Sequence, residues 1–467
     1  MLFSSSVFLI FFLPAVLAVY YIIPHRFLGL RNLFLLLASL GFYAWGEPKF
    51  IRVMLLSILG NYVFGLLADR YREDRSKARL VLAAMLVFNL SIIFVNKYLM
   101  FVLENLNRLP FLSFEVPLIR LPIGISFFTF QSISYVIDIY RGRGTVQKNP
   151  LNVGLYISFF PQLIAGPIVR YQTVAEQILE RHESWDGFSS GACRFIRGLG
   201  KKILLSNTLA IVADRAFDLG PASVAFAWLG AFCYTMQIFF DFSGYSDMAI
   251  GLGRMFGFRF EENFNYPYIS RTVSEFWRRW HISLGSWFRD YVYIPLGGNR
   301  GSRKRQIFNL FVVWLLTGIW HGANWTFICW GLYFFVLLTL EKTFRIEKRN
   351  LPRLPQTALT FLLALFGWVL FRAENLSAAL EYFSAMFGGA GLPLVSDDAV
   401  LLFRENLPVL AASVLFSCPV GQWLKAKLPA LNKVYALVYP LVYILLFLVS
   451  VSYIVKGTYN PFIYFNF

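Results

Sequence analysis

The chain has 467 residues, of which 57% are hydrophobic, 18% aromatic and only 15% charged. This composition, with a mean hydropathy of +0.58, excludes an ordinary soluble protein and predicts an all-α, polytopic membrane protein. The net charge is +17, but the basic residues occur in short loops between apolar segments. This pattern indicates membrane topology and contact with lipid headgroups, and it argues against nucleic-acid binding.

Several apolar segments reach the roughly 17 to 25 residues needed to cross about 30 Å of hydrocarbon. We find no internal repeat and no separate soluble region, so we expect a single integral-membrane domain over residues 1–467. The clearest spans, in chain order, are Ser5–Ile23, Leu30–Trp45, Phe50–Leu67, Leu80–Val102, Ala222–Phe240, Ile307–Leu340, Ala358–Phe371 and Tyr435–Val455.

Loop charge predicts the orientation of the chain. The densest early basic loop is Arg70–Arg79, and by the positive-inside rule it is cytoplasmic. Residues 254–305 mix polar, aromatic and glycine residues, and no stretch among them is apolar enough to span. We expect this segment at the cytoplasmic interface, folded against or partly into the helix bundle.

His321 lies inside the apolar run Leu315–Trp325. Burying an imidazole at membrane depth costs free energy, so we expect a functional role for this histidine by default. The options are a proton relay, a catalytic base and a packed structural residue. As one helix, the surrounding segment Ile307–Leu340 would extend about 50 Å, which exceeds one straight crossing. The glycines beside His321 favour a break there, as a re-entrant hairpin or a pair of helices.

A second block, Glu275–Arg300, is rich in tryptophan and arginine. Its arginines Arg278, Arg279 and Arg289 could bind phosphates through paired hydrogen bonds. The alternative is an interfacial amphipathic helix whose arginines meet anionic lipid. On a continuous helix, positions three, four and seven apart share one side, and here these are Trp277, Trp280, His281 and Phe288.

Two further blocks interrupt the apolar pattern. Phe240–Met248 carries Asp241, Ser243, Tyr245 and Asp247, and such a polar break in an apolar helix can line a substrate site or orient a histidine. Ion pairing with an arginine is the more common fate of an intramembrane carboxylate. In Phe160–Arg170, proline and glycine limit regular helix, so we interpret it as a structural break that lines a cavity.

Taken together, these blocks resemble the membrane-bound O-acyltransferase family, over nearly the whole chain. The Tyr293–Arg300 extension is most similar to the bacterial branch that acetylates polysaccharides, typified by alginate O-acetyltransferase AlgI and its peptidoglycan-acetylating relative PatA. The D-alanine-transferring relative DltB is similar in the histidine motifs and less so in the extension. The matching motifs are Trp277–His281 with Trp287–Tyr291, Gly318–Gly322, Asp241–Asp247 and Pro161–Pro167.

The resemblance implies about eleven transmembrane helices, with re-entrant and interfacial helices, around a central funnel in the bacterial inner membrane. It also implies that acetyl groups from cytosolic acetyl-CoA cross the membrane to a separate extracytoplasmic acetyltransferase of the SGNH or AlgJ/AlgX type. That partner would modify the glycan. His321 matches the family's catalytic histidine and His281 its second, more variable one.

Residue chemistry suggests roles within this scheme. A neutral imidazole can take a proton from an attacking hydroxyl and return it to a thiolate, so His321 is the expected general base. We expect His281 to orient the donor, while the three arginines with Trp277 and Trp280 bind it. Asp290 and Asn324 could each fix a histidine tautomer. The thioester is already activated, so we expect no metal.

Other functions stay open. A transporter would use the histidine for proton coupling, but we find no repeat halves with matching broken helices. A scaffold that only anchors an extracellular acetyltransferase would not need either histidine. D-alanyl transfer to teichoic acid from a carrier protein is a further alternative, since the basic residues Arg300–Arg305 would suit an acidic protein donor.

Overall fold

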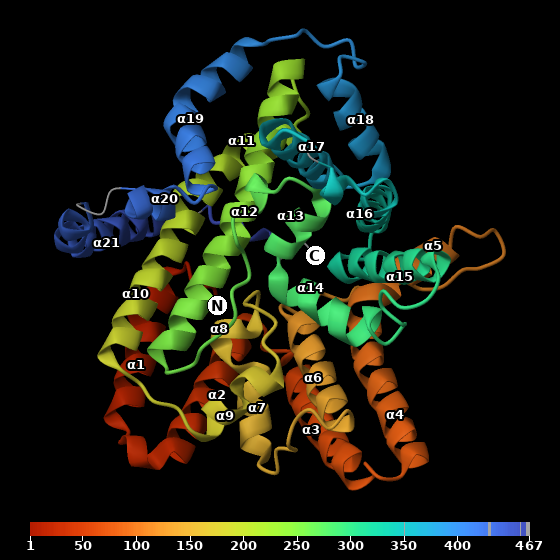
Figure 1. The fold of residues 1–467 in the computed structure, drawn as a ribbon, viewed down its shortest axis with the longest axis vertical. Coiled ribbons are helices and arrows are strands. Elements are labelled where there is room, and N and C mark those ends of the chain that lie inside the picture. Colours follow the sequence, from red (N-terminus) through yellow and green to blue (C-terminus); the bar gives the residue numbers. More distant parts are fainter. Residues whose placement is uncertain (350, 428–430, 458, 464–467) are drawn as a thin grey trace. The chain divides into compact units, whose positions relative to one another are not determined.

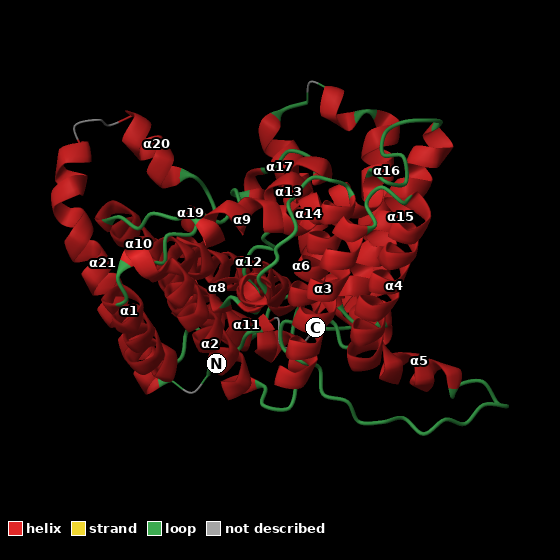
Figure 2. Cartoon of the chain, turned by 90° about the horizontal axis from the view of Figure 1, so that it is seen from below, coloured by secondary structure: helices red, strands yellow, loops and turns green. Residues whose placement is uncertain are grey.

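The computed structural model describes residues 1–349, 351–427, 431–457 and 459–463. Within these ranges the chain forms helices and loops and no β-strand (Figure 2). Its internal contacts divide it into two compact units. Unit 1 comprises Met1–Phe195 and Ser246–Glu261, and unit 2 comprises Ile196–Tyr245 and Glu262–Phe467. The single membrane domain over 1–467 stays a prediction.

Unit 1 contains the first half of the helices (Figure 1). Within it α3, α4 and α6 pack against one another, and α2 packs against α7. The bounds are η1 Val7–Phe12, α1 Leu13–Ile22, η2 His25–Phe27, α2 Leu28–Gly46, α3 Ile51–Arg70, α4 Arg75–Ile93, η3 Phe94–Tyr98, α5 Leu99–Leu106, α6 Ile125–Tyr140, α7 Pro150–Ser158, α8 Phe160–Leu163, α9 Tyr171–Leu179 and most of α10 Trp185–Gly200.

Unit 2 contains the later helices and both sequence blocks that carry a candidate catalytic histidine. Its main contacts join α15 to α16, α16 to α17, and α13 to α16. The bounds are η4 Lys201–Ser206, α11 Asn207–Asp218, the larger part of α12 Val224–Met255, η5 Pro267–Ile269, α13 Val273–Arg279, α14 Ile282–Phe288, η6 Arg289–Tyr293, α15 Arg303–His321, α16 Trp325–Phe344, η7 Ile346–Lys348, α17 Arg353–Arg372, α18 Leu376–Met386, α19 Asp397–Phe416, α20 Val420–Lys427 and α21 Leu431–Lys456.

Eight helical segments of the described chain are long and apolar enough to cross a membrane, which confirms the all-α, polytopic fold. One of them, Asp397–Phe416, was not predicted, because its acidic and basic residues and Pro408 mask the apolar pattern. The first predicted span is shorter than expected, Val7–Ile22. The eight are His25–Gly46, Ile51–Arg70, Arg75–Leu106, Val224–Met255, Trp325–Phe344, Arg353–Arg372, Asp397–Phe416 and Val438–Lys456.

The polar block Phe240–Met248 interrupts the apolar pattern but not the helix, because α12 is continuous from Val224 to Met255. Each carboxylate has a basic partner instead. In unit 2, Asp241 lies 2.5 Å from the buried Lys202, and in unit 1, Asp247 lies 2.8 Å from Arg194. Because the backbone hydrogen bonds of a helix are satisfied internally, paired side chains do not require the helix to break. The break predicted within Phe160–Arg170 is confirmed, since only Phe160–Leu163 of that segment is helical.

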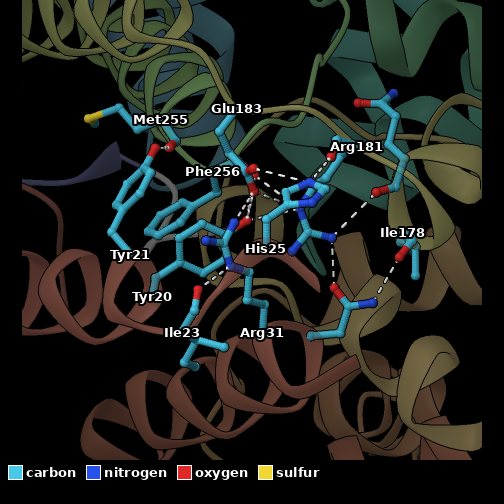
Figure 3. A network of polar contacts seen from close by, with 12 residues as sticks. Tyr20, Tyr21, Ile23, His25, Arg31, Ile178, Arg181, Glu183, Met255 and Phe256 are labelled. Carbon is cyan, nitrogen blue, oxygen red and sulfur yellow. Dashed lines mark hydrogen bonds and ion pairs between the residues drawn. The ribbon is translucent and has the colours of Figure 1, made fainter. Parts of the chain in front are cut away.

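Unit 1 also contains a set of charged and phenolic side chains, here called the polar cluster (Figure 3). It comprises the buried Tyr20, Arg31 and Arg181, the nearly buried Glu183 and the half-exposed His25. The Glu183 carboxylate accepts a hydrogen bond from the Tyr20 hydroxyl. It also lies 2.9 Å from the Arg31 guanidinium and 3.8 Å from that of Arg181. The arginines in turn donate to backbone and amide oxygens. Buried charges are therefore balanced within one cluster.

Candidate functional site

His321 is the last residue of α15, and α16 begins at Trp325. Between them Gly322 and Asn324 have extended backbone angles, and the Asn324 side chain accepts a hydrogen bond from the Thr326 N–H at 3.1 Å, which caps α16. The long apolar segment is therefore two helices that pack together, with the break beside His321 as predicted.

Two glycines allow α15 and α16 to approach closely. A Cβ atom on Gly318 would lie 2.5 Å from the Phe327 carbonyl oxygen, and one on Gly331 would lie 2.4 Å from the Trp314 carbonyl oxygen. Such distances are far inside van der Waals contact, so a larger residue at either position would push the helices apart. Gly318, three residues before His321 in the sequence motif, thus has a packing role that also places His321.

Aromatic rings surround His321, whose residue surface is 8% exposed. The Trp330 ring meets the imidazole edge-to-face at a centroid distance of 4.9 Å, and Phe371 does so at 5.1 Å. Trp320, its chain neighbour, lies at 4.9 Å. These rings come from α15, α16 and α17, so three helices together fix the plane of the imidazole.

The tryptophan and arginine block is not one continuous helix, contrary to expectation. Helix α13 ends at Arg279, and α14 begins at Ile282. His281 lies between them with φ +45°, in the left-handed region that side chains with a Cβ atom rarely adopt. The predicted shared side of a single helix is therefore wrong, because the chain turns at the histidine itself.

His281 is 2% exposed, and its imidazole meets the Phe242 ring edge-to-face at 4.6 Å. Its Nδ1 atom lies 3.1 Å from Oδ1 of Asn263. Burial lowers the pKa of His281 below its ordinary value, because the charged form loses its water. The Trp320 ring lies 6.1 Å from His281 and 4.9 Å from His321. The two histidines thus share one aromatic neighbour, although they are far apart in sequence.

Trp277 and Trp280 belong to the aromatic core of unit 2 and not to an exposed helix face. Trp277 contacts Trp330 at 5.5 Å, and Trp330 in turn contacts His321. Trp280 lies 4.7 Å from Trp368. The two residues predicted to bind the donor therefore form part of the wall behind His321.

Glu341, near the end of α16, anchors the start of α13. Its carboxylate accepts hydrogen bonds from the backbone N–H groups of Val273 and Ser274, at 2.5 and 2.8 Å, and from the Ser274 hydroxyl at 2.7 Å. A carboxylate at a helix N-terminus is favourable because it meets unsatisfied N–H groups. Glu341 thereby ties the helix that carries Trp277 to the helix that carries Trp330.

The three candidate phosphate-binding arginines each have a carboxylate neighbour. Arg278 lies 2.8 Å from Glu347, and both side chains are largely exposed. Arg279 lies 2.9 Å from Glu275, and Arg289 lies 2.7 Å from Asp290. The Arg278–Glu347 pair is exposed and therefore weak, whereas the other two pairs are partly buried, so a phosphate could compete most readily for the Arg278 guanidinium.

The remaining sequence-predicted residues lie in two places. Asp241, Ser243 and Tyr245 are buried on α12. Asp241 pairs with Lys202 and accepts the Ile463 N–H at 3.0 Å, and the centroid of the Tyr245 ring lies 5.0 Å from that of Phe462. Asp290 pairs with Arg289, and Asn324 caps α16 and donates to the Glu374 carbonyl at 2.8 Å.

Sequence reasoning missed several residues around the histidines. Asn263 lies 18 positions before His281, in a loop without a recognisable motif. Trp330 and Phe371 are apolar residues in predicted spans, and in sequence they cannot be distinguished from ordinary core residues. Ser283 follows His281 closely, but nothing in the pattern separated it from the other small residues of the block.

Comparison with known proteins agrees with this geometry. The family model described as MBOAT, membrane-bound O-acyltransferase family, matches residues 145–369, which include both histidines and the rings of Phe242, Trp320 and Trp330 beside them, and end two residues before Phe371. A probable alginate O-acetylase AlgI from Azotobacter vinelandii is 46% identical over 392 residues, or 83% of this chain and 78% of the relative. The chain belongs to the membrane-bound O-acyltransferase family. It is thus a multi-pass membrane acyltransferase.

Other members of the family match with lower identity. A peptidoglycan O-acetyltransferase from Helicobacter pylori is 34% identical over 456 residues, which cover 90% of this chain and 86% of the relative. A teichoic acid D-alanyltransferase from Bacillus subtilis is 30% identical over 274 residues, which cover 54% of this chain and 69% of the relative. Similarity to this membrane-bound O-acyltransferase is therefore more extensive among O-acetylating relatives than among D-alanylating ones.

Proposed function

We propose that this acyltransferase takes acetyl from cytosolic acetyl-CoA and passes it across the bacterial inner membrane. The recipient is an extracytoplasmic acetyltransferase of the SGNH or AlgJ/AlgX type, which O-acetylates a polysaccharide such as alginate. The observation that carries the proposal is His321 at the end of a helix, within the residues matched by the acyltransferase family model and held by the rings of Trp320, Trp330 and Phe371. The similarity to an alginate O-acetylase and to a peptidoglycan O-acetyltransferase supports the acetyl group and a glycan as the final acceptor.

In the proposed reaction, His321 is the general base. The acceptor hydroxyl oxygen attacks the carbonyl carbon of the thioester, the carbon–sulfur bond breaks, and the imidazole carries the hydroxyl proton to the departing thiolate. This requires a neutral imidazole that can hold one proton briefly, and the rings around His321 fix its orientation for both transfers.

Donor binding is assigned to the cytoplasmic side of the same unit. Arg278, Arg279 and Arg289 would exchange their carboxylate neighbours for the phosphates of CoA, which guanidinium groups bind in a paired geometry. Trp277 and Trp280 support this region from the aromatic core. His281 would orient the donor, and Glu341 would hold α13 in place beneath it.

The testing experiment is acetylation of the secreted or wall glycan in cells that carry His321→Ala. We expect acetyl content to fall by about 10²- to 10⁴-fold, the typical contribution of a general base, with normal membrane abundance and partner co-purification. His182→Ala is the matched control, because its side chain is 79% exposed and lies in unit 1. Retained acetylation in His321→Ala would contradict the base assignment and favour a scaffold or conduit.

Donor identity needs a separate assay. Purified protein supplied with acetyl-CoA radiolabelled in its acetyl group, and with the partner acetyltransferase as acceptor, should release CoA and transfer the label to the acceptor in a His321-dependent reaction. The D-alanyl thioester of a carrier protein is the comparison donor, because D-alanyltransferases are among the relatives. Turnover with the D-alanyl carrier alone would overturn the acetyl-CoA assignment while leaving the acyltransferase chemistry in place.

A further inference from the structure

Asn263 contacts the turn that carries His281, and it is 1% exposed. Its backbone oxygen accepts the Ile282 N–H at 3.0 Å. Its side-chain Oδ1 accepts the Ser283 N–H at 3.2 Å and the Ser283 hydroxyl at 2.9 Å, and it lies 3.1 Å from Nδ1 of His281. One asparagine thus holds the first two N–H groups of α14 and the imidazole at once.

The orientation of the Asn263 amide follows from the Ser283 backbone. A main-chain N–H can only donate a hydrogen bond, so the amide atom that faces it must be the oxygen and not the nitrogen. The same oxygen faces Nδ1 of His281. An oxygen acceptor 3.1 Å from a ring nitrogen requires that nitrogen to carry the proton, because two acceptors would repel.

The Ser283 hydroxyl does not change this conclusion. It lies 3.5 Å from Nδ1 of His281, at the limit of a hydrogen bond, and 2.9 Å from the Asn263 oxygen. The shorter contact takes the hydroxyl proton. Nδ1 of His281 is then left to donate to Asn263, and the backbone turn at φ +45° keeps the ring at that distance.

We propose that Asn263 fixes His281 in the neutral tautomer with the proton on Nδ1, so that Nε2 is the nitrogen that accepts a hydrogen bond or a proton in the acyl-transfer site. Asn263 is thus a positioning residue. The burial that lowers the pKa of His281 favours the neutral ring. In that form Nε2 has a lone pair and no hydrogen.

The tautomer decides what His281 can bind. An unprotonated Nε2 accepts a hydrogen bond from a hydroxyl or an amide N–H, such as the hydroxyl of the acyl acceptor or the amide of a pantetheine arm. It cannot donate to the oxyanion of a tetrahedral intermediate. The consequence for acyl transfer rests on the proposed function, whereas the tautomer itself does not.

The test is a long-range proton–nitrogen NMR spectrum of protein labelled with ¹⁵N-histidine, in lipid nanodiscs and without substrate. The chain has only four histidines, and a His281→Gln variant identifies the signals of interest. In the wild-type protein we expect a protonated Nδ1 and an unprotonated Nε2 for His281. A protonated Nε2 with an unprotonated Nδ1 would overturn the proposal.

Three variants separate positioning from folding. Asn263→Asp keeps an acceptor oxygen and should keep the tautomer, whereas Asn263→Leu should lose it and give mixed or reversed signals. Asn309→Leu is the control, because Asn309 is equally buried but donates to the Gly298 carbonyl. An unchanged His281 signal in Asn263→Leu would also overturn the proposal. If Asn263→Leu does not fold, the spectra of the wild-type protein and of Asn263→Asp test the proposal. Loss of the His281 Nδ1 proton in Asn263→Asp would then contradict it.

Glycan acetylation gives the second readout. We expect Asn263→Leu to lose at least about 10-fold in acetyl transfer, by analogy with other catalytic histidines that lose their tautomer. Asn263→Asp should recover most of that loss. If the spectra are as expected but acetyl transfer is absent in the wild-type protein, the proposed function fails and the tautomer assignment stands.

Discussion

The polar cluster of unit 1 and the histidine site of unit 2 are both buried and ionisable, but their neighbours differ. In the cluster, the Glu183 carboxylate lies beside Arg31 and Arg181 (Figure 3). At the histidine site, the imidazoles of His281 and His321 lie among aromatic rings. Opposite charges in contact stabilise one another and resist proton exchange. Aromatic rings carry no net charge that would hold an imidazole in its charged form, and this difference supports the proposal that the histidines, and not the polar cluster, take part in proton transfer.

The largest effect on folding is expected from Glu183→Ala. It leaves Arg31 and Arg181 buried without their carboxylate, and breaking a buried pair in this way typically costs about 3 to 5 kcal/mol. We expect low yield and a lower thermal midpoint by fluorescence-detected size exclusion. Glu180→Ala is the control, because its side chain is 82% exposed. A normal midpoint with lost acetylation would instead place chemistry in the cluster.

The same carboxylate predicts a pH dependence. Burial by itself raises the pKa of Glu183, but the Tyr20 hydroxyl, Arg31 and Arg181 outweigh it and hold the pKa below its usual value. A lowered pKa in the folded state means that its stabilisation is complete above the unfolded value of about 4.3 and is lost as the pH falls further. Thermal midpoints measured from pH 7 to 3.5 should fall less steeply in Glu183→Gln. Parallel curves for the two proteins would contradict this.

A smaller effect is expected from Glu341→Gln. The variant loses the charge that meets the start of α13, and hydrogen bonds to charged groups contribute about 1.5 to 3 kcal/mol each. We expect slower acetyl transfer and a higher KM for the donor, since α13 carries Arg278 and Arg279 and shifts against α16. Glu347→Gln is the control, because that carboxylate is exposed and pairs with Arg278. Equal rates in the two variants would argue against an anchoring role.

The smallest effect on stability is expected from Arg278→Ala. Both side chains of its ion pair with Glu347 are exposed, so the free energy of unfolding should change by no more than about 1 kcal/mol and the thermal midpoint should shift little. If the guanidinium binds a donor phosphate, the KM for acetyl-CoA should rise by roughly 10-fold, as expected for one lost charged hydrogen bond. A KM equal to that of the wild-type protein would remove Arg278 from the donor site.

Much of the fold followed from local pattern. Long apolar segments predicted the spans, and the glycines around His321 predicted the break between α15 and α16. The missed span, Asp397–Phe416, shows the limit of this reasoning, since charges within a segment hide its apolar face. The continuous helix α12 shows a second limit, because the sequence does not reveal that Lys202, on another element, pairs with Asp241 within the polar block.

The sequence by itself determined that this is a helical membrane protein with two histidine motifs, because hydropathy, glycine and proline act locally along the chain. It also supplied the family resemblance that the comparisons confirm. Only the tertiary structure decided which side chains surround the histidines. Asn263, Trp330 and Phe371 come from three separate elements, and their approach depends on packing between helices that no local pattern encodes.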